Sequence, residues 1–315
     1  MTTASATDAT GTTYPDILGH PRGLFVCFTT EMWERFSFYG MKYLLLLYLT
    51  KYHLFSDANG LEVLGSYAAL VYAMPVIGGL LADRYLGMRK AVIFGGGLLV
   101  LGHLGMAMEG NPAYRENGAV IRDQFALQVF YFSLALIVIG VGFLKPNIST
   151  IVGRLYPADD PRRDSGFTIF YMGINLGAFS ATLLCGYLGE TLGWGYGFGA
   201  AGLGMLLGLV TFLRGQKYLQ GLAEPPDPEL LRQPSPIGLS RENSIYLCGL
   251  LAVCAAWQML QFHGAVGITL NTLSVAVLLG LTWFIALRCE PVERDRMIVL
   301  VILTVSSVMF WALFE

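Results

Sequence analysis

Four charged residues lie inside the first long apolar stretch of the chain. Glu31, Glu34 and Arg35 are followed by Lys42 in a segment that is otherwise largely hydrophobic. A charge at the centre of a bilayer costs on the order of 3 kcal/mol, so four are tolerated only where they pair with one another or face water. In a helix Arg35 lies one turn from Glu31 and two turns from Lys42. The charges therefore share one helix face, and ion pairs along that face are expected.

A fifth charge, Lys145, lies in another apolar stretch and directly precedes Pro146. Proline weakens a helix, and unsatisfied backbone groups at membrane depth are tolerated only beside a cavity or polar partners. The neighbouring Asn147 supplies one such partner. Asn175, in the following apolar stretch, and Glu315, at the last position of the sequence, add further polar groups.

Charged residues inside a membrane protein have two interpretations. A single Glu–Arg pair often only joins helices, whereas a larger cluster is typical of a solvated cavity that handles ions. Two carboxylates and three cations within apolar stretches favour the cavity. A neighbouring carboxylate or a dry site favours the protonated form of a carboxyl group, and a nearby cation favours its ionised form. An exchange of partners between conformations would then let protonation alternate with substrate binding.

Composition places the chain in a membrane. Of its 315 residues 55% are hydrophobic and 13% are charged, whereas soluble domains carry about 25% charged residues. About 20 apolar residues cross the roughly 30 Å of hydrocarbon in a bilayer. Nine such segments are expected, at 24–50, 61–82, 91–109, 126–151, 167–188, 195–213, 244–262, 266–287 and 297–315.

The loops between these segments predict the orientation of the chain. Fourteen of the 20 Lys and Arg residues fall in loops on the side of the N-terminus, and three fall on the other side. Basic loops remain cytoplasmic, so the N-terminus is expected in the cytoplasm and the protein in the plasma (inner) membrane. The longest loop, 214–243, is rich in proline and marks the main boundary after six N-terminal helices.

Several functional classes are disfavoured by what the sequence lacks. No basic cluster points to nucleic acid, and no HExxH or GxSxG motif points to an enzyme. No cofactor is expected, and neither His53 nor His103 is assigned a proton role. The five cysteines form no CxxC pair and are expected to be small buried thiols rather than disulfides or zinc ligands. They are Cys27, Cys185, Cys248, Cys254 and Cys289.

Several motifs resemble those of the proton-dependent oligopeptide transporter (POT) family, a branch of the major facilitator superfamily. The family's first-helix motif is E-x-x-E-R-F-x-Y-Y-G, and residues 31–40 read EMWERFSFYG, with Phe38 in place of the first tyrosine. Residues 79–90, GLLADRYLGMRK, resemble the superfamily's cytoplasmic motif between helices two and three. The resemblance continues almost to the end of the chain, with KP at 145–146, FYMGINLG at 170–177 and FWALFE at 310–315.

The resemblance implies an all-α major facilitator fold. It predicts a cytoplasmic tail over 1–23, a six-helix N-terminal bundle over 24–213, a cytoplasmic linker over 214–243, and an inserted transmembrane hairpin over 244–287. Residues 288–315 are expected to begin a second bundle, as part of its first helix, helix seven. The chain is therefore expected to be part of a longer transporter.

The implied activity is proton-coupled import of di- and tripeptides by alternating access, with protons as the coupling ion and lipid as the surroundings. The residues implied in proton coupling are Glu31, Glu34, Arg35 and Lys145. Those implied in peptide binding are Tyr39, Lys42, Tyr72, Lys145, Asn175 and Trp311. Those implied in gating are Asp83, Arg84, Arg89, Lys90 and Glu315.

Two positions depart from the family pattern. Lys42 stands where arginine is common and lacks its planar fork, so looser binding of a peptide carboxylate is expected. Phe38 lacks a hydroxyl group, which is expected to alter peptide preference more than coupling. Two alternatives stay open: a transporter for nitrate, amino acids or another small solute, and a membrane scaffold in which these residues are idle.

Overall fold

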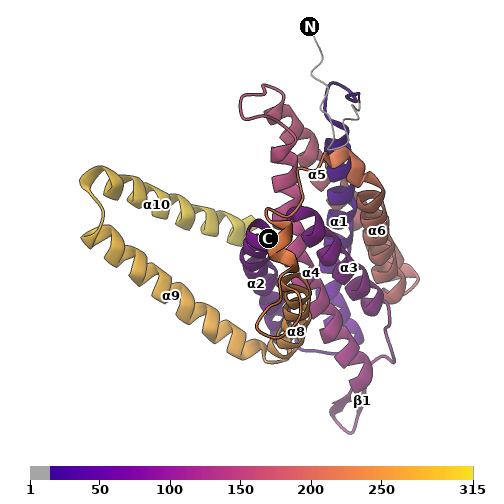
Figure 1. Ribbon diagram of the computed structural model, residues 1–315. Helices are drawn as coiled ribbons and strands as arrows, with labels where there is room; N and C mark the ends of the chain where they lie inside the picture. The colour runs from indigo at the N-terminus through magenta and orange to yellow at the C-terminus, as the bar shows by residue number, and fades with distance from the viewer. Residues whose placement is uncertain (1–14, 315) are drawn as a thin grey trace. The chain divides into compact units, whose positions relative to one another are not determined.

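The computed structural model describes residues 15–314, apart from the side chains at positions 263, 265, 266, 270, 271, 311, 312 and 314. Within this range the chain is almost entirely helical (Figure 1). The α-helices are α1 (Arg22–Leu47), α2 (Asp57–Leu81), α3 (Met88–Met106), α4 (Gln124–Arg154), α5 (Arg163–Thr191), α6 (Trp194–Gly215), α7 (Pro228–Arg232), α8 (Arg241–Gln261), α9 (His263–Leu287) and α10 (Pro291–Phe314).

Shorter elements connect these helices. α1 and α2 continue into the π-helical turns η1 (Tyr48–Tyr52) and η2 (Ala82–Leu86), and α6 continues into the 3₁₀ turn η3 (Gln216–Leu219). The strands β1 (Tyr114–Glu116) and β2 (Ala119–Ile121) form a small antiparallel hairpin before α4.

Within the described residues, each of the nine apolar segments expected from the sequence falls largely on one of the long helices. Among the described residues, six helices are long and apolar enough to cross a membrane, namely α2, α4, α5, α6, α8 and α9. α1, which carries the four charges, is not among the six, and neither are α3 and α10.

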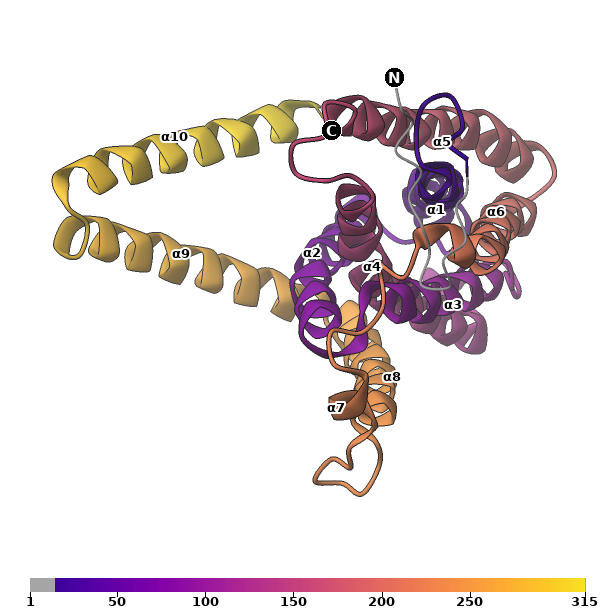
Figure 2. The ribbon, with the colours of Figure 1, turned by 45° about the horizontal axis from the view of Figure 1, so that its top comes forward.

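The chain divides into two compact units, 1–263 and 264–315. In the first unit α1 packs against α5 and α6, and α3 packs against α4 and α6 (Figures 1 and 2). α4 also contacts α2 and α8, and it is the most deeply buried of the candidate spans. The second unit contains α9 and α10. The domain limits expected from the sequence remain a prediction. The helix contacts place α8, which was expected in the inserted hairpin, with the first unit.

Close approach of α2 to α4 depends on two glycines and a proline. A methyl group at Gly78 of α2 would overlap the carbonyl group of Gly142 on α4. Pro146 lies four residues after Gly142 and has no N–H group, so the usual helical hydrogen bond from residue i+4 to this carbonyl is missing. Small residues let membrane helices approach where lipid supplies no hydrophobic drive. The contact brings α2 against α4 beside Lys145.

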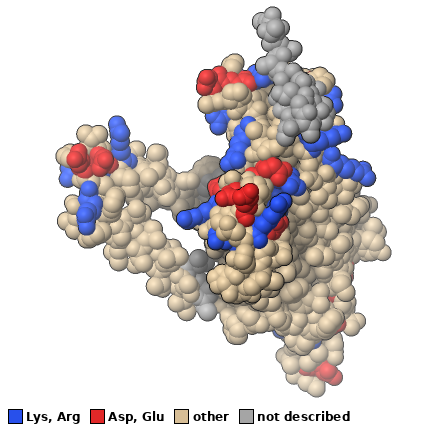
Figure 3. All heavy atoms as spheres, viewed as in Figure 1, with Lys and Arg blue, Asp and Glu red and all other residues tan. Residues whose placement is uncertain are grey.

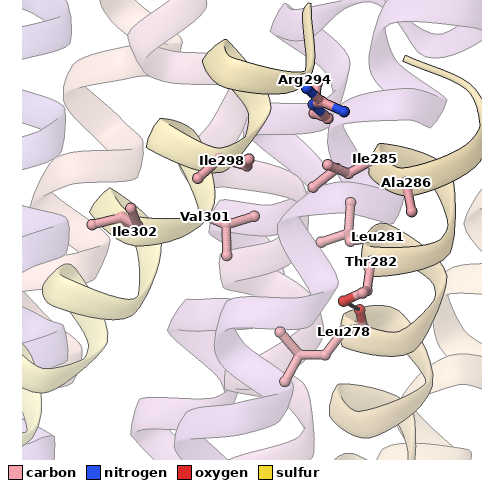
Figure 4. A pocket seen from close by; sticks show the side chains of 9 residues that line it. All are labelled: Leu278, Leu281, Thr282, Ile285, Ala286, Arg294, Ile298, Val301 and Ile302. Atoms are coloured by element: carbon pink, nitrogen blue, oxygen red, sulfur yellow. Dashed lines mark hydrogen bonds between the residues drawn. The ribbon is translucent and has the colours of Figure 1, made fainter. Parts of the chain in front are cut away.

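In the second unit α9 and α10 enclose a hollow of about 470 Å³ (Figure 4). Its walls are apolar apart from Thr282 of α9 and Arg294 of α10. Leu278, Leu281, Ile285 and Ala286 line it from α9, and Ile298, Val301 and Ile302 line it from α10.

Charge is distributed unevenly over the first unit. Lys and Arg side chains gather toward the end from which α1 starts, above a broad uncharged belt (Figure 3). Helix ends and loops there contribute Arg22, Arg84, Arg89, Lys90, Arg154, Arg162 and Arg163. An uncharged belt between two charged ends is what a bilayer requires of the protein surface.

At the opposite end of the bundle His53 is fully buried in an aromatic cluster after η1. Its ring lies 4.7 Å from that of Tyr48 and 5.9 Å from that of Phe130, and neither ring nitrogen has a hydrogen-bond partner among the described residues. Arg122 donates to the backbone oxygens of His53 and Leu54 at 2.7 and 3.1 Å. Burial and the Arg122 charge lower the pKa of His53 to about 4.

Replacing Gly78 by alanine is expected to destabilise the first unit by about 1–3 kcal/mol, because the added methyl group separates α2 from α4. The matched control is Gly65→Ala, on the same helix, where an added methyl group meets no atom within 4 Å. Thermal unfolding in detergent measures both variants. Equal melting temperatures would show that the contact contributes nothing.

His53 predicts a loss of stability in acid. A histidine whose folded-state pKa is lowered gives stability that is complete above its unfolded pKa, near 6.5, and is lost as the pH falls toward 4. The loss amounts to about 3 kcal/mol. Melting temperatures of the wild type and His53→Phe between pH 7 and 4 test this. The variant should show the smaller decrease, and parallel curves would contradict the expectation.

Candidate functional site

The charges of α1 form a buried ion cluster of Glu31, Glu34 and Arg35. Their exposed fractions are 3%, 0% and 4%. The Arg35 guanidinium binds both oxygens of Glu34, with Nε donating to Oε2 and Nη2 donating to Oε1 at 2.7 Å. The same Nε lies 3.2 Å from Oε1 of Glu31, one turn earlier on the helix. One cation therefore serves two carboxylates, and the second oxygen of Glu31 is buried with no hydrogen-bond partner in the part of the chain that the structure describes.

α5 holds this part of α1 in place. A Cβ atom at Gly177 of α5 would overlap the backbone of Met32 and lie 3.1 Å from Cβ of Arg35. The two helices therefore touch through their backbones beside the ion cluster. Because a buried charge is costly unless it is paired, the close contact and the ion pairs support each other.

Lys145 joins the cluster from α4. Its Nζ lies 5.0 Å from the centre of the Tyr72 ring, a cation–π contact between α4 and α2. It also interacts electrostatically with Arg35, Glu34 and Glu31. The structure thus brings together the four residues expected in proton coupling, from two helices separated by about 100 residues of sequence.

Among the residues expected to bind peptide, Tyr39 and Tyr72 lie beside this cluster, and Asn175 lies on the exposed side of α5. Tyr39 is half-buried, stacks on Tyr43 with ring centres 5.8 Å apart, and interacts electrostatically with Arg35, Tyr72 and Lys42. The side chain of Tyr72 is 61% exposed.

Asn175 lies on an exposed face of α5, where its amide donates to the Tyr171 backbone oxygen at 3.1 Å. The Trp311 side chain and Glu315 lie outside the described residues.

The four gating residues in the first unit separate into two pairs. Asp83 and Arg84 are exposed and line an open hollow of about 580 Å³ with Val76, Gly79 and Leu80. Arg89 and Lys90 instead contact the linker. Arg89 donates to both carboxylate oxygens of Glu224 at 2.6 and 2.9 Å, and Lys90 lies 2.6 Å from a carboxylate oxygen of Glu242.

The linker from Gln216 to Glu242 is a strap over the α2–α3 turn. The backbone N–H of Arg89 donates to the Ala223 carbonyl, and a Cβ atom at Gly87 would lie 2.5 Å from the backbone nitrogen of Pro225. Gly87 also has a positive φ of 76°, which favours glycine. Leu219, Ala223 and Leu231 of the strap are buried.

Two features of the site were not predicted from the sequence. The strap's carboxylates pair with residues about 135 and 152 positions earlier, and no periodicity in the sequence carries such a signal. Tyr67 of α2 is 1% exposed, its hydroxyl lacks a partner, and it interacts electrostatically with Glu34 and Arg35. The sequence signal that could have pointed to Tyr67 was its polar hydroxyl group within an apolar membrane helix.

No group of three or more His, Cys, Asp or Glu residues within the described part of the chain is placed to hold a metal ion. The charged groups of the ion cluster pair with one another.

Comparison with known proteins decides the family. The sequence model of the POT family matches residues 89–315. The chain belongs to the POT family. The resemblance carried by the motifs is thereby confirmed. POT proteins are multi-pass membrane transporters and not enzymes, so the helical membrane fold expected from the sequence is confirmed as well.

Relatives agree over nearly the whole chain. It is 39% identical to the uncharacterized transporter YclF of Bacillus subtilis, over 94% of this chain and 58% of that protein. It is 33% identical to the di-/tripeptide transporter of Lactococcus lactis subsp. lactis, over 94% of this chain and 59% of that protein. The chain thus spans less than two thirds of the length of these relatives.

A solved structure of the family has the same fold. The crystal structure of a peptide transporter POT in complex with sulfate superimposes with a TM-score of 0.74 at 37% identity. The superposition covers 98% of this chain and 61% of that chain.

The pair formed by Arg89 and Glu224 gives a testable prediction for the strap. Arg89→Glu or Glu224→Arg alone should expose the linker to limited proteolysis, and the double charge swap should restore protection. Because both side chains are partly exposed, the coupling energy is expected to be about 1 kcal/mol and to fall in high salt. Strictly additive effects of the two changes would exclude direct coupling.

Proposed function

We propose that the transporter containing this chain imports di- or tripeptides together with protons by alternating access. The observation that carries the proposal is the shared guanidinium of Arg35, which binds Glu34 through two bonds and Glu31 through one inside a membrane protein. Two acceptors competing for one buried cation form a site where one proton changes the arrangement of partners.

Charge balance links protons to substrate. Glu31 and Glu34 carry two negative charges, and Arg35 and Lys145 carry two positive ones, so the cluster is neutral when both carboxylates are ionised. A proton on Glu31, whose second oxygen is buried and unpaired, makes the cluster positive by one charge. A peptide carboxylate is then attracted to it, and loss of the proton favours release.

The side chains near the cluster suit a peptide. Lys42 and Lys145 are the cations for the peptide carboxylate, and Tyr39, Tyr72 and Asn175 offer rings and polar atoms to the rest of the molecule. Trp311 completes the peptide-binding set in this proposal. The Lactococcus lactis relative, a di-/tripeptide transporter, supports this substrate class.

Gating and orientation complete the proposal. Asp83 and Arg84, together with Glu315, serve as gate residues, whereas Arg89 and Lys90 act in the gate through their hold on the strap. The N-terminus lies in the cytoplasm, because the basic residues gather at the end of the bundle from which α1 starts (Figure 3).

Glu34→Gln is expected to lower accumulation of a labelled dipeptide under an inward proton gradient by roughly tenfold or more, because the amide cannot take part in the charge exchange. Exchange of labelled for unlabelled peptide without a gradient should persist. The assay uses the full-length gene product in proteoliposomes. The matched control is Glu116→Gln, on the exposed β-hairpin.

Excess unlabelled dipeptide, nitrate or single amino acids in the same assay identifies the substrate class. Competition by nitrate or amino acids but not by dipeptides would replace the peptide assignment with another small solute. Unchanged gradient-driven uptake by Glu34→Gln would remove Glu34 from the coupling mechanism. An absence of uptake for every solute would favour a membrane scaffold.

A further inference from the structure

Tyr67 places an unpaired hydroxyl group beside the ion cluster. Its side chain lies on α2 and is 1% exposed, and within the described part of the chain its hydroxyl has no hydrogen-bond partner. A buried hydroxyl without a partner is less favourable than the hydrogen atom of phenylalanine at the same position. Its presence in the core therefore calls for a partner in another arrangement of the site.

Glu34 is a candidate for that partner. Tyr67 interacts electrostatically with Glu34, with Arg35 and with Tyr72. In the arrangement described, both oxygens of Glu34 are occupied by Arg35. Arg35 has another acceptor within reach, since Oε1 of Glu31 lies 3.2 Å from its Nε. If Arg35 moves to that acceptor, Glu34 loses its donors, and Tyr67 offers a buried hydroxyl that interacts with it electrostatically.

The aromatic ring on the other side of Arg35 cannot supply this donor. Phe38 lies beneath the guanidinium, with its ring centre 5.0 Å from the Arg35 carbon Cζ, and has no hydroxyl group. Lys145 is a cation on α4 that interacts with Glu34 as well, but its ammonium group is held over Tyr72. Tyr67 therefore differs from both neighbours: it is a neutral donor that adds no charge to the cluster.

We propose that Tyr67 is a positioning residue for proton release, whose hydroxyl donates to the Glu34 carboxylate when Arg35 transfers to Glu31. The proposal rests on the proton-coupled function and deepens it. Arg35 pairs with Glu31 only when that carboxyl is ionised, so its arrival drives the proton from Glu31 to water. Tyr67 keeps Glu34 ionised and hydrogen-bonded meanwhile, and no covalent bond other than O–H is made or broken.

Tyr67→Phe tests the proposal in the full-length transporter reconstituted in proteoliposomes. Accumulation of a labelled dipeptide under an inward proton gradient should fall by roughly tenfold, the usual effect of losing a hydrogen bond to a charged group. Exchange of peptide without a gradient needs no proton release and should stay within about twofold of the wild type. A more alkaline vesicle interior should restore part of the lost rate.

Two controls separate this role from a structural one. Tyr48→Phe removes another fully buried phenol hydroxyl, one that donates to the Glu109 carbonyl, and should leave the ratio of accumulation to exchange unchanged. The melting temperature of Tyr67→Phe should equal or exceed that of the wild type, because the hydroxyl lost is unpaired. Wild-type ratios in Tyr67→Phe, or equal losses of accumulation and exchange with a lower melting temperature, would overturn the proposal.

A measurement without transport keeps this inference distinct from the peptide assignment. Arg35→Met removes the guanidinium without adding a donor, which leaves Tyr67 as the neutral donor for Glu34. Infrared spectra across a pH series then follow the carboxyl C=O band, assigned by its loss in Glu34→Gln. Adding Tyr67→Phe should raise the midpoint pH of that band. An unchanged midpoint overturns the role of Tyr67 whatever solute the transporter carries, whereas a shifted midpoint without peptide uptake refutes only the peptide assignment.

Discussion

Desolvation of the charges on α1 is the constraint on which the rest of the first unit depends. Glu31, Glu34 and Arg35 are almost completely buried in a bundle that shows a broad belt without charged side chains (Figure 3). Removal of one partner from such a cluster leaves an uncompensated charge, and this is far more costly than the net energy of the pair. The helices that surround α1 must therefore hold their positions closely enough to keep each charge paired.

Glycines at the helix contacts hold the helices close enough to keep these charges paired. Gly177 brings α5 onto the backbone of α1 beside Arg35, and Gly78 brings α2 onto the backbone of α4 three residues before Lys145. Contacts between backbones leave less freedom than contacts between long side chains, so the positions of Arg35 and Lys145 are fixed by the helices themselves. In the proposed mechanism the side chains exchange partners over short distances while the bundle stays unchanged.

Local signals in the sequence were sufficient to predict the long helices and the ion pair between residues of the same helix. Hydropathy located the nine long helices, and the four-residue spacing of Glu31 and Arg35 predicted their ion pair. Hydropathy and helical spacing do not predict contacts between segments that are distant in the sequence. The pairing of Arg89 with Glu224 joins positions 135 residues apart, and Tyr67 resembles any aromatic core residue until the neighbouring helix is placed. The grouping of α8 with α4 depends in the same way on tertiary contacts.

The strap and the ion cluster together suggest how motion is divided within the first unit. Arg89 and Lys90 fasten the α2–α3 turn to the linker, and Gly87 lies directly against its backbone. The turn therefore moves with the bundle, because displacing it would break the ion pairs and expose Leu219 and Leu231. Transporters of this superfamily are built from repeats that move largely as rigid bodies around a central site. A bundle fastened at its basic end is suited to that division under the proposed mechanism. Partner exchange around Arg35 would alter the charge of the cluster, and the bundle would move as one body.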